Sequence, residues 1–207
     1  VLLDMRGQGE WRRGDTPDGP YAPAAGPSAY VTRGLPDPDS YYYTRLIVDA
    51  VRAVGATSGL AGVDAGRIAV IGTSQGGGVS LAVAGLTQVA AVVADVPFLC
   101  HFIRGMEITD SRGYADIVDY LRVYRHSEPA VRRTLSYVDA MNHATRASAP
   151  ALISVGLHDP VCPPSTVFAA YNHYAGPKRL QLWPFNRHES GEIDQFDVAV
   201  AFLDAVL

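Results

Sequence analysis

The chain has 207 residues, of which 48% are hydrophobic and 18% are charged, and its formal net charge is −4. This length suits one α/β domain, and a charged fraction below the ~25% of an average soluble domain favours a compact or oligomeric protein over a disordered one. A negative net charge without a basic block gives no electrostatic reason to expect nucleic acid or an anionic membrane surface as a partner. We therefore expect a small or neutral substrate.

The sequence predicts neither a membrane anchor nor a disulfide framework. No run is long and apolar enough to span a bilayer, and no charged and then apolar leader precedes the domain. The two cysteines, Cys100 and Cys162, are far apart and form no Cys-x-x-Cys pair. We expect two reduced thiols in a cytoplasmic protein.

The first apolar run, Val1 to Met5, predicts a buried strand, which the sequence Arg6-Gly7-Gln8-Gly9 ends. Because the chain opens inside this run without an initiator Met, we expect that something upstream is missing. Residues 14–38 are rich in Pro, Gly, Asp and Ala and are too irregular for a helix or strand. A loop of this length is either functional, an interface or a surface excursion.

Alternating helices and strands follow. Residues 39–56 carry apolar side chains at helical spacing and predict a crossover helix. Residues 67–73 predict a strand, residues 76–86 a helix, and residues 89–96, which are nearly all apolar and β-branched, a central parallel strand. This order indicates a doubly wound, mostly parallel sheet.

Residues 98–149 depart from this alternation. Helical spacing around Ile117, Tyr120 and Tyr124 predicts one amphipathic helix, and residues 128–144 predict one or two more. An insertion that emerges from the carboxyl ends of strands either covers an active site or is a purely structural cap. The alternation then resumes in four segments, which are strand 151–156, helix 165–174, strand 178–185 and helix 196–207.

The sequence Gly72-Thr73-Ser74-Gln75-Gly76 lies between a predicted strand and a predicted helix. A Gly-x-Ser-x-Gly pattern in this position indicates a nucleophile elbow with Ser74 as the nucleophile. We expect both glycines to be required, because a side chain at either position would collide with the neighbouring strand or helix.

A serine hydroxyl needs a base to take its proton and an acid to orient that base. In doubly wound hydrolases the order along the chain is Ser, then Asp or Glu, then His. His188 follows the last predicted strand and is our choice of base. Asp159, which ends strand 151–156, is our choice of acid, and Asp95 is the alternative, although a structural hydrogen-bonding role is plausible for it. Five other histidines compete with His188: His101, His126, His143, His158 and His173.

The oxyanion of a tetrahedral intermediate needs about two N–H donors. The backbone of Gln75 supplies the first, and the second normally comes from a loop after an earlier strand, which would lie before Val1. Pro97 and Val161, near the carboxyl edge of the predicted sheet, are candidates for the wall of a small acyl pocket. We expect no metal and no cofactor, since the chain has no His-Glu-x-x-His, no Gly-x-Gly-x-x-Gly and no phosphate loop.

Taken together, these residues resemble carbohydrate esterase family seven, the acetyl xylan esterases and cephalosporin C deacetylases of the α/β-hydrolase superfamily. The resemblance runs through nearly the whole chain and rests on six pieces of sequence: Arg6-Gly7-Gln8, Gly72-x-Ser74-Gln75-Gly76-Gly77, Asp159 with Cys162-Pro163-Pro164-Ser165-Thr166, His188-Glu189, the stretch from Asp37 to Tyr43, and Ala94-Asp95-Val96-Pro97-Phe98.

The resemblance implies that Ser74, Asp159 and His188 form the triad of a serine esterase. It implies removal of acetyl groups from small substrates, such as acetylated xylo-oligosaccharides and cephalosporin C. It also implies a homo-oligomer, typically a hexamer, that the loop after Arg6-Gly7-Gln8 helps to assemble. Since family members carry earlier strands before this motif, the resemblance implies that N-terminal strands of the fold are missing. Two alternatives stay open: a truncated, non-catalytic assembly subunit, and a carboxylesterase or peptidase for larger substrates on the same fold.

Overall fold

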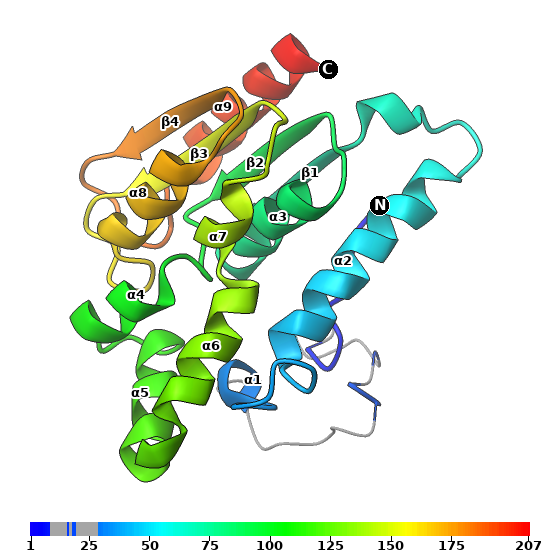
Figure 1. The fold of residues 1–207 in the computed structure, drawn as a ribbon. Helices are drawn as coiled ribbons and strands as arrows, with labels where there is room; N and C mark the ends of the chain where they lie inside the picture. Colours follow the sequence, from blue (N-terminus) through cyan, green and yellow to red (C-terminus); the bar gives the residue numbers. More distant parts are fainter. Residues whose placement is uncertain (9–15, 17, 20–28) are drawn as a thin grey trace.

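The computed structural model describes residues 1–8, 16, 18–19 and 29–207 (Figure 1). Four of its strands form one parallel sheet in the order β1-β2-β3-β4. Their bounds agree within two residues with the four strands predicted from residue 67 onward: β1 Ala69–Thr73, β2 Ala91–Asp95, β3 Ala151–Gly156 and β4 Lys178–Trp183.

The helices of the described residues follow the predicted alternation. No described helix is both long and apolar enough to cross a membrane. Two short 3-10 turns, η2 Ala65–Arg67 and η3 Arg125–Ser127, interrupt the connections. The α-helices are α1 Ala29–Thr32, α2 Tyr42–Ser58, α3 Gln75–Leu86, α4 Phe102–Ile108, α5 Tyr114–Val123, α6 Glu128–Val138, α7 Ala140–Ala144, α8 Pro164–His173 and α9 Glu192–Val206.

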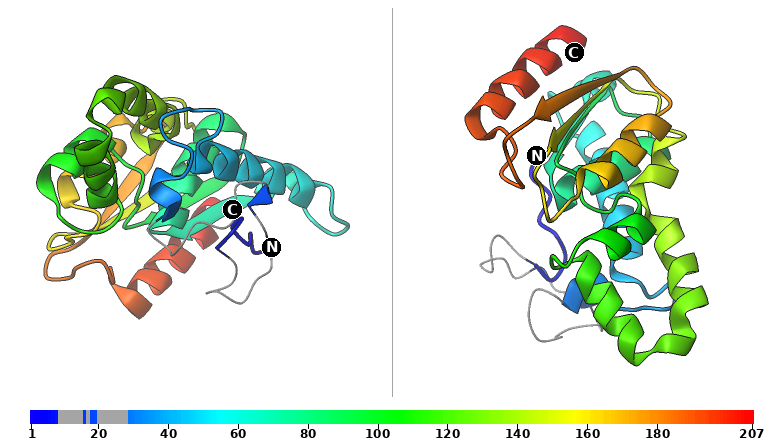
Figure 2. Two further views of the ribbon diagram at one scale, coloured as in Figure 1. Left: turned by 90° about the horizontal axis from the view of Figure 1, so that it is seen from below. Right: turned by 90° about the vertical axis from the view of Figure 1, so that its left-hand side faces the viewer.

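Both faces of the sheet are covered, because successive side chains of a strand point to opposite faces. On β2, Val92 and Ala94 belong to the large core cluster that includes residues of α2, α3, α7 and α8. Ala91 and Val93 belong to a smaller cluster with Phe202 of α9. Figure 2, in its right-hand view, shows α9 on one side of the sheet and the other helices on the opposite side. The near-continuous apolar runs that predicted central strands therefore reflect burial on two faces.

The regular elements within residues 98–149 are all helices, as predicted. They include α4, α5, α6 and α7, of which α4 contacts α8, α5 contacts α1, and α6 contacts α2. Figure 1 shows α4 next to the end of the sheet where β3 and β4 finish, with α5 and α6 beyond it. The segment therefore extends the molecule on the side of the carboxyl ends.

Two predictions for the N-terminal region are wrong. Val1 to Met5 is not a strand: Val1 and Leu2 are 92% and 87% exposed, and only Leu3 and Met5 pack against the large cluster. An apolar run becomes a strand only when a neighbour completes its backbone hydrogen bonds, and the run by itself does not provide that neighbour. The prediction that 14–38 holds no regular element falls mostly outside the described residues, but its end contains the helix α1.

Candidate active site

Ser74 lies at the tight turn between β1 and α3. Its backbone has φ 54° and ψ −114°, outside the regions that non-glycine residues usually occupy. The surrounding backbone holds this conformation: Ser74 N–H donates to the Asp95 carbonyl at 2.8 Å, and its own carbonyl accepts from Gly78 N–H at 3.0 Å and Phe98 N–H at 2.8 Å. The strand-turn-helix geometry expected of a nucleophile elbow is therefore present.

The two glycines of the motif have different roles. A Cβ built on Gly72 would lie 2.2 Å from the carbonyl carbon of Gly76, so position 72 has no room for a side chain. A Cβ on Gly76 would meet nothing within 4 Å, so the prediction that both glycines avoid a collision is wrong for Gly76. Gly78, outside the motif, is as restricted as Gly72, because its Cβ would lie 1.9 Å from the Phe98 carbonyl oxygen. The crowding at Gly78 arises where α3 crosses the loop after β2, which the local sequence does not reveal.

His188 connects Ser74 to Asp159. Its Nε2 is 2.9 Å from Ser74 Oγ, and its Nδ1 is 2.8 Å from Asp159 Oδ2. Because a carboxylate only accepts, Nδ1 carries the proton in the neutral ring, and Nε2 accepts from the Ser74 hydroxyl. The structure thus brings together the three residues that the sequence selected from separate strand ends.

Asp159 is fixed by its own turn. Its side chain is fully buried, whereas the His188 side chain is 29% exposed. Asp159 Oδ1 accepts from the backbone N–H groups of Val161 at 2.8 Å and Cys162 at 2.9 Å, so that Oδ2 is directed at His188. The acid is therefore held in the orientation in which it can position the imidazole and stabilise the imidazolium that forms during catalysis.

Asp95, the alternative acid, is hydrogen bonded elsewhere. Its Oδ1 accepts from the hydroxyls of Ser190, at 2.6 Å, and Ser154, and its Oδ2 is 3.3 Å from Thr73 Oγ1. Ser154 also accepts from Val96 N–H at 3.0 Å. The structural role considered for Asp95 is therefore the one observed: it ties β1, β2 and β3 to the segment that carries His188.

Sequence reasoning missed this contribution of Ser154 and Ser190. Ser154 is polar within the otherwise apolar strand β3 and is fully buried. A lone serine in a strand buried on both faces signals a hydrogen-bond partner in the interior, and this signal was available. Ser190 gave no such signal.

The other histidines do not reach Ser74. His158, His126 and His173 are exposed, and His101 caps the N-terminus of α4 by accepting from Arg104 N–H. His143 is buried, with Nε2 2.9 Å from the Tyr137 carbonyl and Nδ1 3.2 Å from an Arg146 guanidinium nitrogen. Burial lowers the pKa of His143, which keeps the ring neutral and structural.

Gln75 is the first residue of α3. At this position a backbone N–H has no acceptor within its own helix, so it is available to an anion at the turn. The Gln75 side chain points away from that role, into a polar cluster with Gln8 and Tyr43. The sequence predicted the N–H as a donor but not the contacts of the side chain.

Pro97 and Val161 lie in the segments after β2 and after Asp159. Pro97 is buried, and a Cβ on Gly77 would lie 3.1 Å from its Cα, which places it against the first turn of α3. Val161 is partly buried and belongs to the turn that holds Asp159. Both positions are compatible with an acyl pocket, whose existence stays a prediction.

Cys162 lies beside the three polar residues. Its thiol and the side chains of Asp159 and His188 have potential ligand atoms within 4.8 Å of one another. Burial raises the pKa of this thiol well above its usual value, whereas soft metals bind thiolates. Both ring nitrogens of His188 and both oxygens of Asp159 already have partners within the protein. We therefore assign hydrogen-bonding roles to these groups, and no metal.

Backbone strain concentrates at this edge of the sheet. All the described non-glycine residues with positive φ follow the ends of β1, β2 and β4. They are Ser74, Val96, Leu99, His101, Ser190 and Glu192. Such conformations persist only where the surroundings hold them, and they gather at functional sites. With a nucleophile, base and acid in line, the site is suited to acyl transfer.

The family of this chain follows from comparisons with known proteins. The family model described as acetyl xylan esterase (AXE1) matches residues 1–206. The acetyl esterase Axe7A of Xylanibacter ruminicola is 35% identical over 167 residues, which cover 78% of this chain and 36% of that protein.

Two solved structures are similar over nearly the whole chain. One is an acetyl xylan esterase from a Paenibacillus species, with 44% identity and a TM-score of 0.91, covering 99% of this chain and 64% of that chain. The other is acetyl xylan esterase 1 from a Thermoanaerobacterium species, with 35% identity and a TM-score of 0.85, covering 97% and 63%. The chain thus has the fold of α/β-hydrolase esterases and spans just under two thirds of either solved chain.

Proposed function

Because the chain belongs to the acetyl xylan esterase family, we propose that it removes acetyl groups from small acetylated substrates through an acyl-enzyme on Ser74. The observation that carries this proposal is the continuous hydrogen-bonded line from Ser74 Oγ through His188 to Asp159. Family membership supports the acetyl group as the group removed.

In the proposed mechanism, Ser74 Oγ attacks the acetyl carbonyl carbon while His188 Nε2 takes the hydroxyl proton. Asp159 stabilises the imidazolium, and the N–H of Gln75 donates to the oxyanion. The tetrahedral intermediate collapses, and His188 gives its proton to the leaving alcohol. A water molecule, deprotonated by the same nitrogen, then cleaves the acyl-enzyme and releases acetate.

The finer parts of the proposal concern the substrate and the assembly. We propose acetylated xylo-oligosaccharides and cephalosporin C as substrates, and a homo-oligomer, by family resemblance a hexamer. Exposed apolar side chains on and before α9 support a covered surface there: Phe185 is 88%, Ile193 69% and Phe196 62% exposed. Two buried, free thiols support a cytoplasmic location.

The first experiment is hydrolysis of 4-nitrophenyl acetate by the wild-type protein and Ser74→Ala. We expect the substitution to lower kcat on the order of 10⁴–10⁶-fold, because it removes the nucleophile. Ser80→Ala is the matched control, since Ser80 is a buried serine of α3, the helix that begins directly after Ser74, and this variant should keep its activity. Light scattering on the same samples gives the oligomeric state.

Each other result has a definite meaning. A Ser74→Ala protein that keeps most of its activity would contradict the role of Ser74. A folded oligomer that does not hydrolyse acetyl esters favours a non-catalytic assembly subunit. A preference for octanoyl esters or peptide amides favours a carboxylesterase or a peptidase.

A further inference from the structure

The side chain of Gln75 is held from several directions. Its Oε1 accepts from Tyr43 OH at 2.9 Å and from Gln8 Nε2 at 3.0 Å. Its Nε2 donates to Gln8 Oε1 at 3.2 Å and contacts Met5 Sδ at 2.6 Å. The two amides of Gln8 and Gln75 therefore pair reciprocally, although the residues are 67 positions apart.

Tyr43 is a fixed donor in this cluster. Its ring is 1% exposed, and burial raises the pKa of its hydroxyl well above the usual value, so the proton stays on the oxygen. Because the hydroxyl keeps its proton, it can donate to Gln75 Oε1 across the neutral pH range. The amide orientation of Gln75 follows, since its oxygen must face Tyr43.

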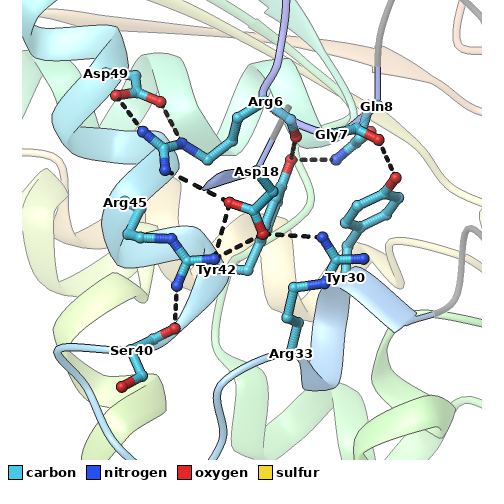
Figure 3. A network of polar contacts seen from close by, with 10 residues as sticks. All are labelled: Arg6, Gly7, Gln8, Asp18, Tyr30, Arg33, Ser40, Tyr42, Arg45 and Asp49. Carbon is cyan, nitrogen blue, oxygen red and sulfur yellow. Dashed lines mark hydrogen bonds and ion pairs between the residues drawn. The ribbon is translucent and has the colours of Figure 1, made fainter. Parts of the chain in front are cut away.

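Gln8 is in turn anchored to α2. Its Nε2 also donates to Tyr42 OH at 2.8 Å, and Tyr42 OH donates to the Arg6 carbonyl at 2.7 Å (Figure 3). The Arg6 guanidinium binds Asp49 through two hydrogen bonds of 2.5 and 2.8 Å. The segment that carries Gln8 is thus tied to the helix that carries Tyr43.

These contacts converge on the residue whose backbone N–H faces the reacting carbonyl in the proposed mechanism. That N–H belongs to the peptide between Ser74 and Gln75, whose carbonyl accepts two backbone hydrogen bonds. The Gln75 side chain adds a further attachment on the N–H side of this peptide, to Gln8 and Tyr43. A misplacement of about 1 Å in a catalytic group can cost ~10²-fold in rate. The contacts of the Gln75 side chain therefore add to the backbone hydrogen bonds that hold the donor.

We propose that Gln8 and Tyr43 are positioning residues that act through the side chain of Gln75 to hold its N–H at the oxyanion. This inference rests on the proposed function. It assigns to the Arg6-Gly7-Gln8 segment a role in catalysis that is separate from any role in assembly. Neither residue touches the reacting atoms.

The test compares Tyr43→Phe and Gln8→Ala with wild type in acetyl ester hydrolysis. We expect each to lower kcat about tenfold with KM within about twofold, because a displaced oxyanion donor weakens the transition state and not the ground state. Tyr41→Phe is the matched control. Tyr41 is equally buried, and its hydroxyl donates to the Val31 carbonyl at 2.8 Å, so the control loses a comparable hydrogen bond away from Gln75. It should keep the wild-type kcat.

A double-mutant cycle separates positioning from general loss of stability. Gln75→Ala keeps the backbone N–H but removes the side chain on which Gln8 and Tyr43 act. In that background, Tyr43→Phe and Gln8→Ala should lower kcat no further. Circular dichroism checks the folding of each variant, and Tyr43→Phe decides the outcome if Gln8→Ala does not fold.

Three results would overturn the inference. The first is an unchanged kcat for Tyr43→Phe and Gln8→Ala in an active enzyme. The second is an equal loss in Tyr41→Phe. The third is an inactive wild-type protein, which removes the proposed function together with the inference, whereas the first two leave the proposed function intact.

Discussion

Asp95 and Asp159 show how single residues of the same type take different roles. Asp95 is the last residue of β2, and Asp159 lies three residues after the end of β3. Asp159 has one oxygen occupied by backbone N–H groups and the other free for His188. Asp95 has its oxygens engaged by hydroxyl groups of three neighbouring segments. The position at a strand end makes an acid a candidate, and the neighbours decide which candidate contacts the base.

Val161 gives a prediction at the residue scale. If it walls a small acyl pocket, Val161→Gly should admit longer acyl groups, since the substitution removes the whole side chain beside the turn that holds Asp159. We expect the ratio of kcat/KM for octanoyl to acetyl esters to rise by roughly tenfold, the scale of one or two methylene groups in an apolar pocket. An unchanged ratio in a folded, active variant would contradict a pocket role for Val161.

The nucleophile elbow is defined at the scale of elements. β1, the turn and α3 are joined so closely that the helix begins at the residue after Ser74. The turn brings the Cβ position of Gly72 to 2.2 Å from the Gly76 backbone, while the Cβ position of Gly76 points into open space. Of the two glycines of the motif, the fold therefore requires the one before the serine.

This asymmetry predicts opposite effects on stability. Gly72→Ala should lower the free energy of unfolding by about 3 kcal/mol or more, because the backbone of the turn must move to admit the methyl group. Gly76→Ala should change it by less than about 1 kcal/mol, and a gain is expected from the better helix propensity of alanine. Urea unfolding of both variants measures the difference. Equal destabilisation by the two substitutions would show that the elbow is crowded on both sides.

At the scale of the whole molecule, a buried carboxylate joins the N-terminal segment to the helical body. The side chain of Asp18 is fully buried, and its carboxylate forms ion pairs with three guanidinium groups (Figure 3). The nitrogen–oxygen distances are 2.9 Å to Arg33, 2.7 Å to Arg45 and 3.5 Å to Arg6. Burial alone would raise the pKa of Asp18, but the hydrogen bonds and charges of Arg33 and Arg45 outweigh it, and the pKa is lowered. The charged form is therefore the one that stabilises the fold.

Asp18→Asn should lower the free energy of unfolding at pH 7 by about 3 kcal/mol, the scale for breaking a buried ion pair. A carboxylate with a lowered folded pKa stabilises above its unfolded pKa, here the usual value of 3.8, and its contribution disappears as the pH falls through the folded value. Urea unfolding of both proteins between pH 7 and pH 3 should show that the difference in the free energy of unfolding between wild type and Asp18→Asn becomes smaller as the pH falls.

The control for this prediction is Asp119→Asn. Asp119 pairs with Arg122 at 2.7 Å, but its side chain is 65% exposed, and such pairs contribute ~0–1 kcal/mol. If Asp18→Asn changed the free energy of unfolding at neutral pH as little as Asp119→Asn does, the result would contradict a stabilising role for the buried carboxylate.

The sequence by itself determined the alternation of strands and helices from residue 39 onward and the order Ser74, Asp159, His188 along the chain. Both are local properties: periodicities of two and 3.6 residues identify the elements, and a parallel sheet places their carboxyl ends at one edge. The structure of the segment before residue 39 was harder to predict, because an apolar run such as Val1 to Met5 does not indicate whether a neighbouring strand is present.

Only the tertiary structure decided which contacts form between distant residues. The hydrogen bond of Ser74 to His188 spans 114 positions, that of Gln8 to Gln75 spans 67, and that of Ser190 to Asp95 spans 95. Such contacts depend on the register of the strands and on how loops and helices cross, because a hydrogen bond requires its atoms to be placed within tenths of an ångström. A local pattern determines only which face or end of an element a residue occupies. For this reason the motif identified the nucleophile, but the packing around it assigned the roles of Asp95, Gly76 and the Gln75 side chain.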